Sequence, residues 1–140
     1  KQYYGARHVL ISGSSAGAHM ALMLGILHPD LFDGIQTFMG LINTGFRVSY
    51  QRLVKQHPES LSRNLPVLMI HGWKDPYISV ASAKETYQWM KNQGFDVQLI
   101  VRPSMEHQHY IPDNAFILDW FRSTLSQPSS SAHPSPKILP

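Results

Sequence analysis

The stretch His8-Val9-Leu10-Ile11-Ser12-Gly13-Ser14-Ser15-Ala16-Gly17 decides how this chain folds. Its first four residues predict a short buried strand, because they are mostly apolar and β-branched or bulky. The run that follows, from Ala18 to Leu27, is apolar on nearly all sides and predicts a buried helix. Between the two lies the pattern Gly-x-Ser-x-Gly, centred on Ser15. A strand, a sharp turn and a helix in this order form a nucleophile elbow, which exposes the central serine at its tip.

The elbow carries three local expectations. Ser15 should have a strained backbone, and the small residues Gly13 and Gly17 should let the strand and the helix approach closely. The N–H of Ala16, at the start of the helix, should point at a developing oxyanion. The plainer interpretation is a Ser/Gly-rich loop in which Ser14 or Ser15 caps the helix. The strand before the pattern and the helix after it favour the elbow.

Composition sets the class of molecule. The chain has 140 residues, of which 43% are hydrophobic and 15% charged, as in one globular domain with a core. Its 12 Lys and Arg residues against 9 Asp and Glu residues are scattered, so no nucleic-acid-binding stripe is indicated. The absence of cysteine excludes a disulfide framework, a thiolate nucleophile and cysteine-based zinc sites. No apolar run reaches the roughly 18 residues of a spanning helix, and since the chain begins at Lys1, a signal peptide cannot be judged.

The elements that follow alternate between strand and helix. Further strands are predicted at 34–39, 65–70 and 97–101, and helices at 16–27, 80–93 and 114–125. A short helix is expected at 50–57, whereas 41–49 shows no clear period. This order predicts an α/β fold, a parallel sheet with flanking helices. Residues 1–126 form the domain, and the Pro/Ser-rich segment 127–140 is expected to be a disordered tail.

Three strand ends carry residues capable of chemistry. The first leads to Ser15, the third to Asp75, and the fourth to His107 or His109. The carboxyl ends of parallel strands share one edge of the sheet, where active sites collect. A serine nucleophile needs an imidazole base, and the base needs a carboxylate to orient it. A metal pair formed by the two histidines is the weaker alternative, because no cysteine or carboxylate cluster completes it.

These segments resemble the α/β-hydrolase family over residues 5–125. The resemblance rests on the elbow at 13–17, the helix exit at 28–34, the strand and loop at 66–76, and the segment Met105-Glu106-His107 followed by Asp119-Trp120-Phe121. It implies the triad order Ser15, Asp75, His107, with His107 favoured over His109. It also implies no cofactor and no metal. The segments look most like carboxylesterases, feruloyl esterases and dienelactone hydrolases, and a peptidase similar to prolyl oligopeptidase is the alternative.

Other residues near the expected site carry weaker hypotheses. Trp73 and Tyr77 flank Asp75 and are candidates for the wall of an acyl or alcohol pocket, or for packing. His71, at a strand end, is interpreted as structural. His19, inside the elbow helix, lies either near the site or in the core, and Glu106 is interpreted as solvated or as a residue that supports the site without entering it.

The resemblance also implies that this chain supplies only the last four strands of a fold of about eight. In the family, the first half carries the loop with the second oxyanion donor, and its absence would leave the elbow strand at a bare apolar edge. Two functions follow. The chain is part of a serine hydrolase that acts on a small-molecule carboxylic ester through an acyl-enzyme and needs the N-terminal half, or it is a truncated, non-catalytic relative.

Overall fold

The sheet of the computed structural model has four parallel strands in the order β1-β2-β3-β4, which is also their order along the chain. The structure describes residues 5–56 and 65–126. The strands are β1 (Leu10–Ser14), β2 (Gly34–Phe38), β3 (Val67–Gly72) and β4 (Val97–Arg102), and the helices are α1 (Ala16–Leu27), α2 (Thr44–Gln56), α3 (Val80–Asn92) and α4 (Asp113–Ser126). The predicted α/β class, with its parallel sheet and flanking helices, is confirmed.

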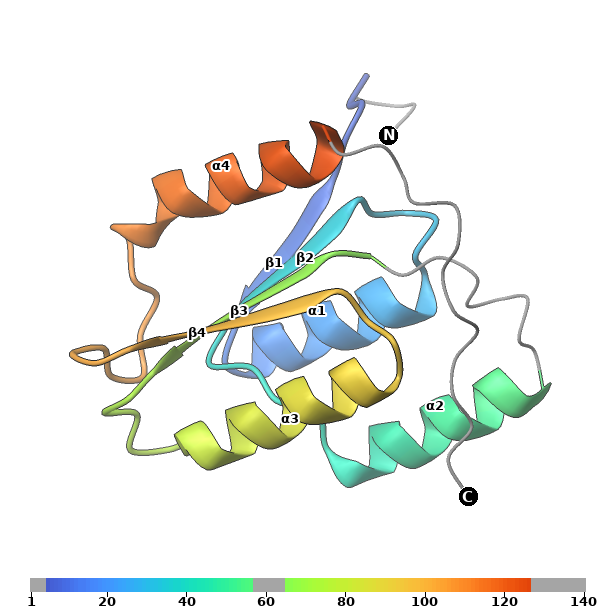
Figure 1. Ribbon diagram of the computed structural model, residues 1–140, viewed down its shortest axis with the longest axis horizontal. Helices are drawn as coiled ribbons and strands as arrows, with labels where there is room; N and C mark the ends of the chain where they lie inside the picture. Colours follow the sequence, from blue (N-terminus) through green and yellow to red (C-terminus); the bar gives the residue numbers. More distant parts are fainter. Residues whose placement is uncertain (1–4, 57–64, 127–140) are drawn as a thin grey trace.

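The helices lie in two layers (Figure 1). α1, α2 and α3 cover one face of the sheet, and α4 covers the other. Because successive side chains of a strand point to opposite faces, each layer has its own core. Ile35, Val67 and Met69 pack in the cluster with α1, α2 and α3. Phe38, Leu68 and Ile70 pack in the cluster that contains Trp120 and Phe121 of α4.

Helix α2 starts much earlier than the sequence pattern indicates. It begins at Thr44, not at residue 50. The side chain of Asn43 accepts a hydrogen bond from the backbone N–H of Phe46 at 2.8 Å, which is the geometry of a helix N-cap. Gly45 disfavours a helix in the sequence, which is why the first turn of α2 was not predicted. Phe46, Tyr50 and Val54 nevertheless lie at helical spacing and are buried. The Asn43 cap was the signal that could have located the start.

Helix α1 has the expected bounds but is not buried on all sides. Ala18, Leu22 and Ile26 are buried, whereas Met20 is 51% exposed and Leu24 is 39% exposed. β1, which leads into this helix, is the edge strand of the described sheet, as expected for the elbow strand. No described strand lies beyond β1. The outer side of α1 is therefore uncovered, although the side chains on it are apolar.

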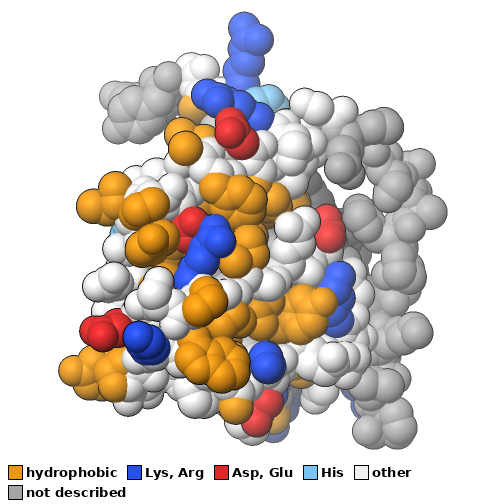
Figure 2. Space-filling model, turned by 60° about the vertical axis from the view of Figure 1, so that its left-hand side comes forward, with side chains coloured by type: hydrophobic (Ala, Val, Ile, Leu, Met, Phe, Trp, Pro, Cys, Tyr) orange, Lys and Arg blue, Asp and Glu red, His pale blue; other side chains and the backbone are white. Residues whose placement is uncertain are grey.

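The remaining differences at element ends are small. β3 is shifted by two residues from the prediction, and Pro66 lies just before it, where a strand tolerates proline. The Pro/Ser-rich tail expected at 127–140 lies outside the described residues. Within residues 5–56 and 65–126, no helix combines the length and apolar character needed to cross a bilayer. On the face in Figure 2, basic and acidic side chains are interspersed among hydrophobic ones.

Candidate active site

Ser15 occupies the turn between β1 and α1 in a strained conformation. Its φ is 54° and its ψ is −119°, a region that side-chain-bearing residues rarely adopt. Its backbone N–H donates to the carbonyl oxygen of Phe38 at 3.0 Å, which ties the turn to the end of β2. The expected strain at the elbow serine is therefore present.

The two elbow glycines have different roles. A Cβ atom on Gly13 would lie 2.2 Å from the carbonyl oxygen of Gly17, so the close approach of strand and helix requires glycine at position 13. A Cβ atom on Gly17 would meet no described atom within 4 Å. The expectation that Gly17 must be small is wrong within the described structure, because Gly17 contributes its backbone, not a missing side chain, to the contact.

Asp75 follows β3, and its side chain is fully buried. Its Oδ1 accepts hydrogen bonds from the backbone N–H groups of Tyr77 at 2.8 Å and Ile78 at 2.9 Å. Burial by itself would raise the pKa of Asp75, but hydrogen bonds from the Ile78 N–H, the His107 ring and the Tyr77 N–H outweigh it, and the pKa is lowered. Asp75 is thus held as a carboxylate at neutral pH, with Oδ2 directed at His107.

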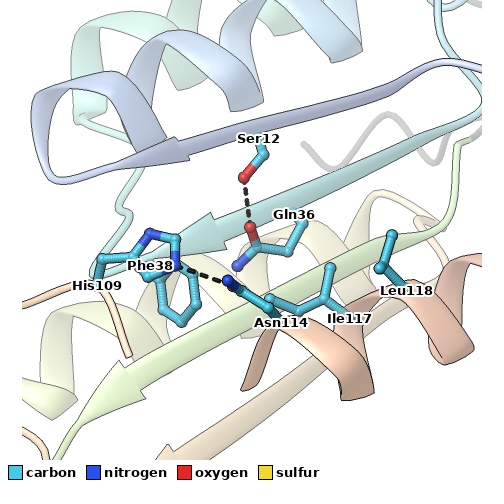
Figure 3. Close-up of a pocket in the computed structure, with 7 residues that line it drawn as sticks. All are labelled: Ser12, Gln36, Phe38, His109, Asn114, Ile117 and Leu118. Atoms are coloured by element: carbon cyan, nitrogen blue, oxygen red, sulfur yellow. Dashed lines mark hydrogen bonds between the residues drawn. The ribbon is translucent and has the colours of Figure 1, made fainter. Parts of the chain in front are cut away.

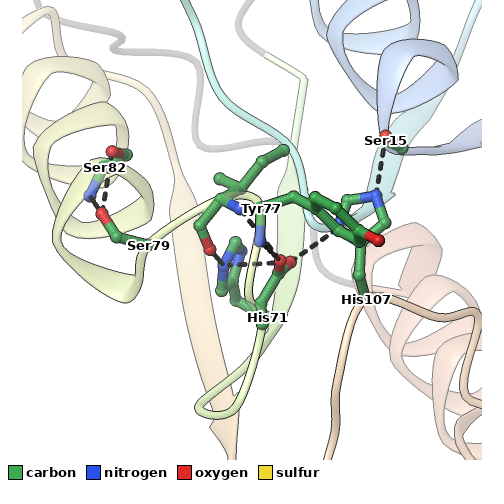
Figure 4. Close-up of polar contacts among 8 residues, drawn as sticks. Ser15, His71, Tyr77, Ser79, Ser82 and His107 are labelled. Carbon is green, nitrogen blue, oxygen red and sulfur yellow. Dashed lines mark hydrogen bonds and ion pairs between the residues drawn. The ribbon is translucent and has the colours of Figure 1, made fainter.

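His107 links the serine and the carboxylate (Figure 4). Its Nδ1 lies 2.8 Å from Oδ2 of Asp75, and its Nε2 lies 2.9 Å from Oγ of Ser15. A carboxylate can only accept, so Nδ1 carries the proton and Nε2 accepts from the Ser15 hydroxyl. The geometry is that of a nucleophile, a base and an orienting acid.

The loop that carries His107 packs against the end of β3. A Cβ atom on Gly72 would lie 2.3 Å from the carbonyl oxygen of Met105, so glycine is required for this approach. The N–H of Lys74 donates to the same oxygen at 3.1 Å, and the N–H of Trp73 donates to the carbonyl of Arg102 at 2.9 Å. At the base of the loop, the guanidinium of Arg102 pairs with the buried carboxylate of Asp113.

The other candidate residues lie around this triad. His109 contacts other residues: its Nε2 lies 3.0 Å from Oδ1 of Asn114, and its ring lies 4.5 Å from that of Phe38. The ring of Tyr77 meets His107 edge to face at 5.1 Å and is 80% exposed, while Trp73 is 62% exposed. Neither aromatic residue lines either of the two cavities described below. Glu106 is exposed, as expected.

The first turn of α1 contributes two further groups. Ala16 is exposed, and its N–H has no backbone acceptor in the described part of the chain, so it is available to a ligand. His19, half-buried, donates from Nδ1 to the carbonyl oxygen of Leu41 at 2.8 Å, and its Nε2 faces the side-chain amide of Asn43. His19 therefore anchors the segment after β2. The role of Asn43 in that contact was not predicted.

Two cavities lie on opposite faces of the sheet, and neither is lined by Ser15, Asp75 or His107. One, of about 490 Å³, runs between α1 and α2 and is lined by His19, Met23, Leu27, Asn43, Phe46, Ser49, Tyr50 and Leu53. The other, of about 240 Å³, lies on the α4 face of the sheet (Figure 3). There, Gln36 accepts a hydrogen bond from the hydroxyl of Ser12, while its buried Nε2 has no partner among the described residues.

Residues 5–56 and 65–126 contain no group of three or more His, Asp or Glu side chains arranged to hold a metal ion.

The parallel sheet and the elbow at the end of β1 define a protein of the α/β-hydrolase fold. The chain belongs to the phospholipase/carboxylesterase family, whose model matches residues 1–120. It is 29% identical over 100 residues to acyl-protein thioesterase 1 of Gibberella zeae, a match that covers 71% of this chain and 40% of that protein.

Solved structures agree on the fold. Arabidopsis thaliana SOBER1 superposes with a TM-score of 0.73 at 21% identity, over 89% of this chain and 58% of that one. The carboxylesterase of Bacillus cereus superposes with a TM-score of 0.64 at 19% identity, over 88% of this chain and 53% of that one. The chain thus spans about half the length of the proteins it matches.

Proposed function

We propose that this chain carries the catalytic triad of a serine hydrolase that acts on carboxylic esters, with Ser15 as nucleophile, His107 as base and Asp75 as orienting acid. The observation that carries the proposal is the continuous hydrogen-bond chain from Ser15 Oγ through His107 to Asp75, at 2.9 and 2.8 Å. The family to which the chain belongs supports the same class of reaction.

In the first half of the proposed reaction, Ser15 Oγ attacks the ester carbonyl carbon while its proton passes to Nε2 of His107. Asp75 stabilises the imidazolium that forms, because its carboxylate lies against the opposite ring nitrogen. The C–O bond to the alcohol then breaks, and the alkoxide leaves with the proton from Nε2. The product of this half is an acyl ester on Ser15.

In the second half, water takes the place of the alcohol. His107 removes a proton from the water, whose oxygen attacks the acyl carbon, and Nε2 returns that proton to Ser15 Oγ as the acyl–enzyme bond breaks. A carboxylic acid leaves. In both halves, the N–H of Ala16 donates to the oxyanion, and the positive end of the α1 dipole favours that charge.

A thioester is the second candidate substrate. The observation that favours it is the match to an acyl-protein thioesterase. The chemistry of the triad is the same, except that a thiolate leaves in place of an alkoxide. A peptidase has less support, since the matched family and this relative are named for the hydrolysis of esters and thioesters.

We further infer that residues 1–126 form the catalytic segment and 127–140 an appended tail, and that full activity uses a further segment that completes the sheet beside β1. Relatives of about twice this length support that inference. We expect such a segment to supply a second oxyanion donor, because removing one donor typically costs about 10²–10³ in rate.

Labelling with a fluorophosphonate probe tests the proposal. We expect the 140-residue chain to be labelled at Ser15, labelling to disappear in Ser15→Ala, and the matched neighbour variant Ser14→Ala to be labelled like the unmodified chain. Turnover of p-nitrophenyl acetate should follow the same pattern. A folded chain that is not labelled, or is labelled equally in Ser15→Ala, refutes the proposal and supports the non-catalytic alternative.

A further inference from the structure

His71 is a buried histidine that takes no part in the proposed reaction. It lies in β3, four residues before Asp75, and is only 1% exposed. Its Nε2 lies 2.9 Å from the carbonyl oxygen of Ile78 (Figure 4). A carbonyl oxygen can only accept a hydrogen bond, so Nε2 carries the proton and donates.

The other ring nitrogen of His71 makes no hydrogen bond that competes with this contact. Nδ1 is buried and has no hydrogen-bond partner in the described part of the chain. The ring is therefore held through Nε2, the atom that donates to the Ile78 carbonyl oxygen.

Ile78 is held from both sides. Its N–H donates to Oδ1 of Asp75 at 2.9 Å, and its carbonyl oxygen accepts from His71. Nε2 of His71 also lies 3.7 Å from Oδ2 of Asp75. That distance is too long for a hydrogen bond, but it places the positive end of the ring dipole near the oxygen that accepts from His107.

We propose that His71 is a positioning residue for the triad carboxylate: its Nε2–H donates to the Ile78 carbonyl, and so keeps the 75–78 turn and both oxygens of Asp75 in place for His107. The role assigned to Asp75 rests on the proposed function. The clamp itself is a property of the fold, so it can be tested without turnover.

The first test uses the unmodified chain. The ¹⁵N chemical shifts of the His71 ring at neutral pH should report a protonated Nε2. A ring protonated on Nδ1 alone overturns the proposal. No variant is needed, so a folding defect cannot obscure the result.

The second test compares His71→Leu with His71→Gln. Leucine removes the donor, whereas the glutamine amide can still donate to the Ile78 carbonyl. In His71→Leu we expect the low-field Nδ1–H signal of His107 to exchange with water roughly fivefold faster, as befits the loss of one ordinary hydrogen bond. The ¹³C titration of the Asp75 carboxyl should move toward its ordinary range. His71→Gln should restore both signals.

Thr86→Val is the matched control. Thr86 is buried and accepts from the N–H of Ile42 at 3.0 Å, so its loss should destabilise the fold without affecting the 75–78 turn. We expect it to lower the melting temperature as His71→Leu does, yet to leave both signals unchanged. The proposal fails if Thr86→Val moves them as much, or if His71→Leu moves neither. Normal signals with no fluorophosphonate labelling would refute the proposed function and leave the clamp intact.

Discussion

Replacing Gly72 by alanine should disable the proposed triad without touching any of its three members. The new Cβ atom would lie 2.3 Å from the carbonyl oxygen of Met105 and 2.7 Å from that of Glu106, whereas ordinary contact begins at 3.4 Å. Both contacts are backbone atoms, so they cannot move aside by a change of rotamer. The loop would have to shift by about 1 Å, and His107 lies directly after Glu106.

A shift of this size would break the contact between His107 Nε2 and Ser15 Oγ, which is now 2.9 Å. A misplacement of about 1 Å in a reacting group can cost roughly 10² in rate, so we expect the rate constant of fluorophosphonate labelling at Ser15 to fall about 100-fold. The assay is time-resolved labelling of the folded variant. Gly45→Ala, in α2 and away from the triad, is the control and should label normally. Labelling of Gly72→Ala within twofold of the unmodified chain would show that the loop accepts the methyl group without displacing His107.

Three further predictions concern charge and burial. Asp75→Asn should lower p-nitrophenyl acetate turnover by up to about 10⁴-fold, because the ring of His107 would lose the partner that fixes its tautomer; unchanged turnover would argue against Asp75 as the orienting acid. The lowered pKa of Asp75 stabilises the fold above its unfolded pKa of about 3.9, and this contribution is lost as the pH falls through the lower folded value. The difference in unfolding free energy between the unmodified chain and Asp75→Asn, from urea titrations, should therefore shrink on acidification; a difference independent of pH would contradict this. Gln36→Leu removes a buried Nε2 without a described partner and also the hydrogen bond from the Ser12 hydroxyl, which is exposed and can turn to water, so the unfolding free energy should change by less than about 1 kcal/mol; a marked fall in the melting temperature would contradict this.

The alternation of elements was predictable because it is written in short-range patterns. The apolar strand before Ser15, the apolar helix after it and the proline at position 29, which ends that helix, each act over a few residues. Helix α1 has the expected bounds, 16–27, for this reason. The start of α2 was missed because Gly45 masked a period that tertiary burial of Phe46 and Tyr50 enforces.

Short-range patterns in the sequence predict a parallel sheet, and they predict that Ser15, Asp75 and a histidine lie at one of its edges. They do not show which histidine faces the serine, because the contact between Ser15 and His107 joins residues 92 apart and depends on how far each strand end extends. The folded structure also shows that Gly13 and Gly72, but not Gly17, are needed for close backbone approaches, and that His71 donates to the Ile78 carbonyl. Local preference acts within a few residues, whereas these features depend on which atoms the folded sheet brings within a few ångströms of one another.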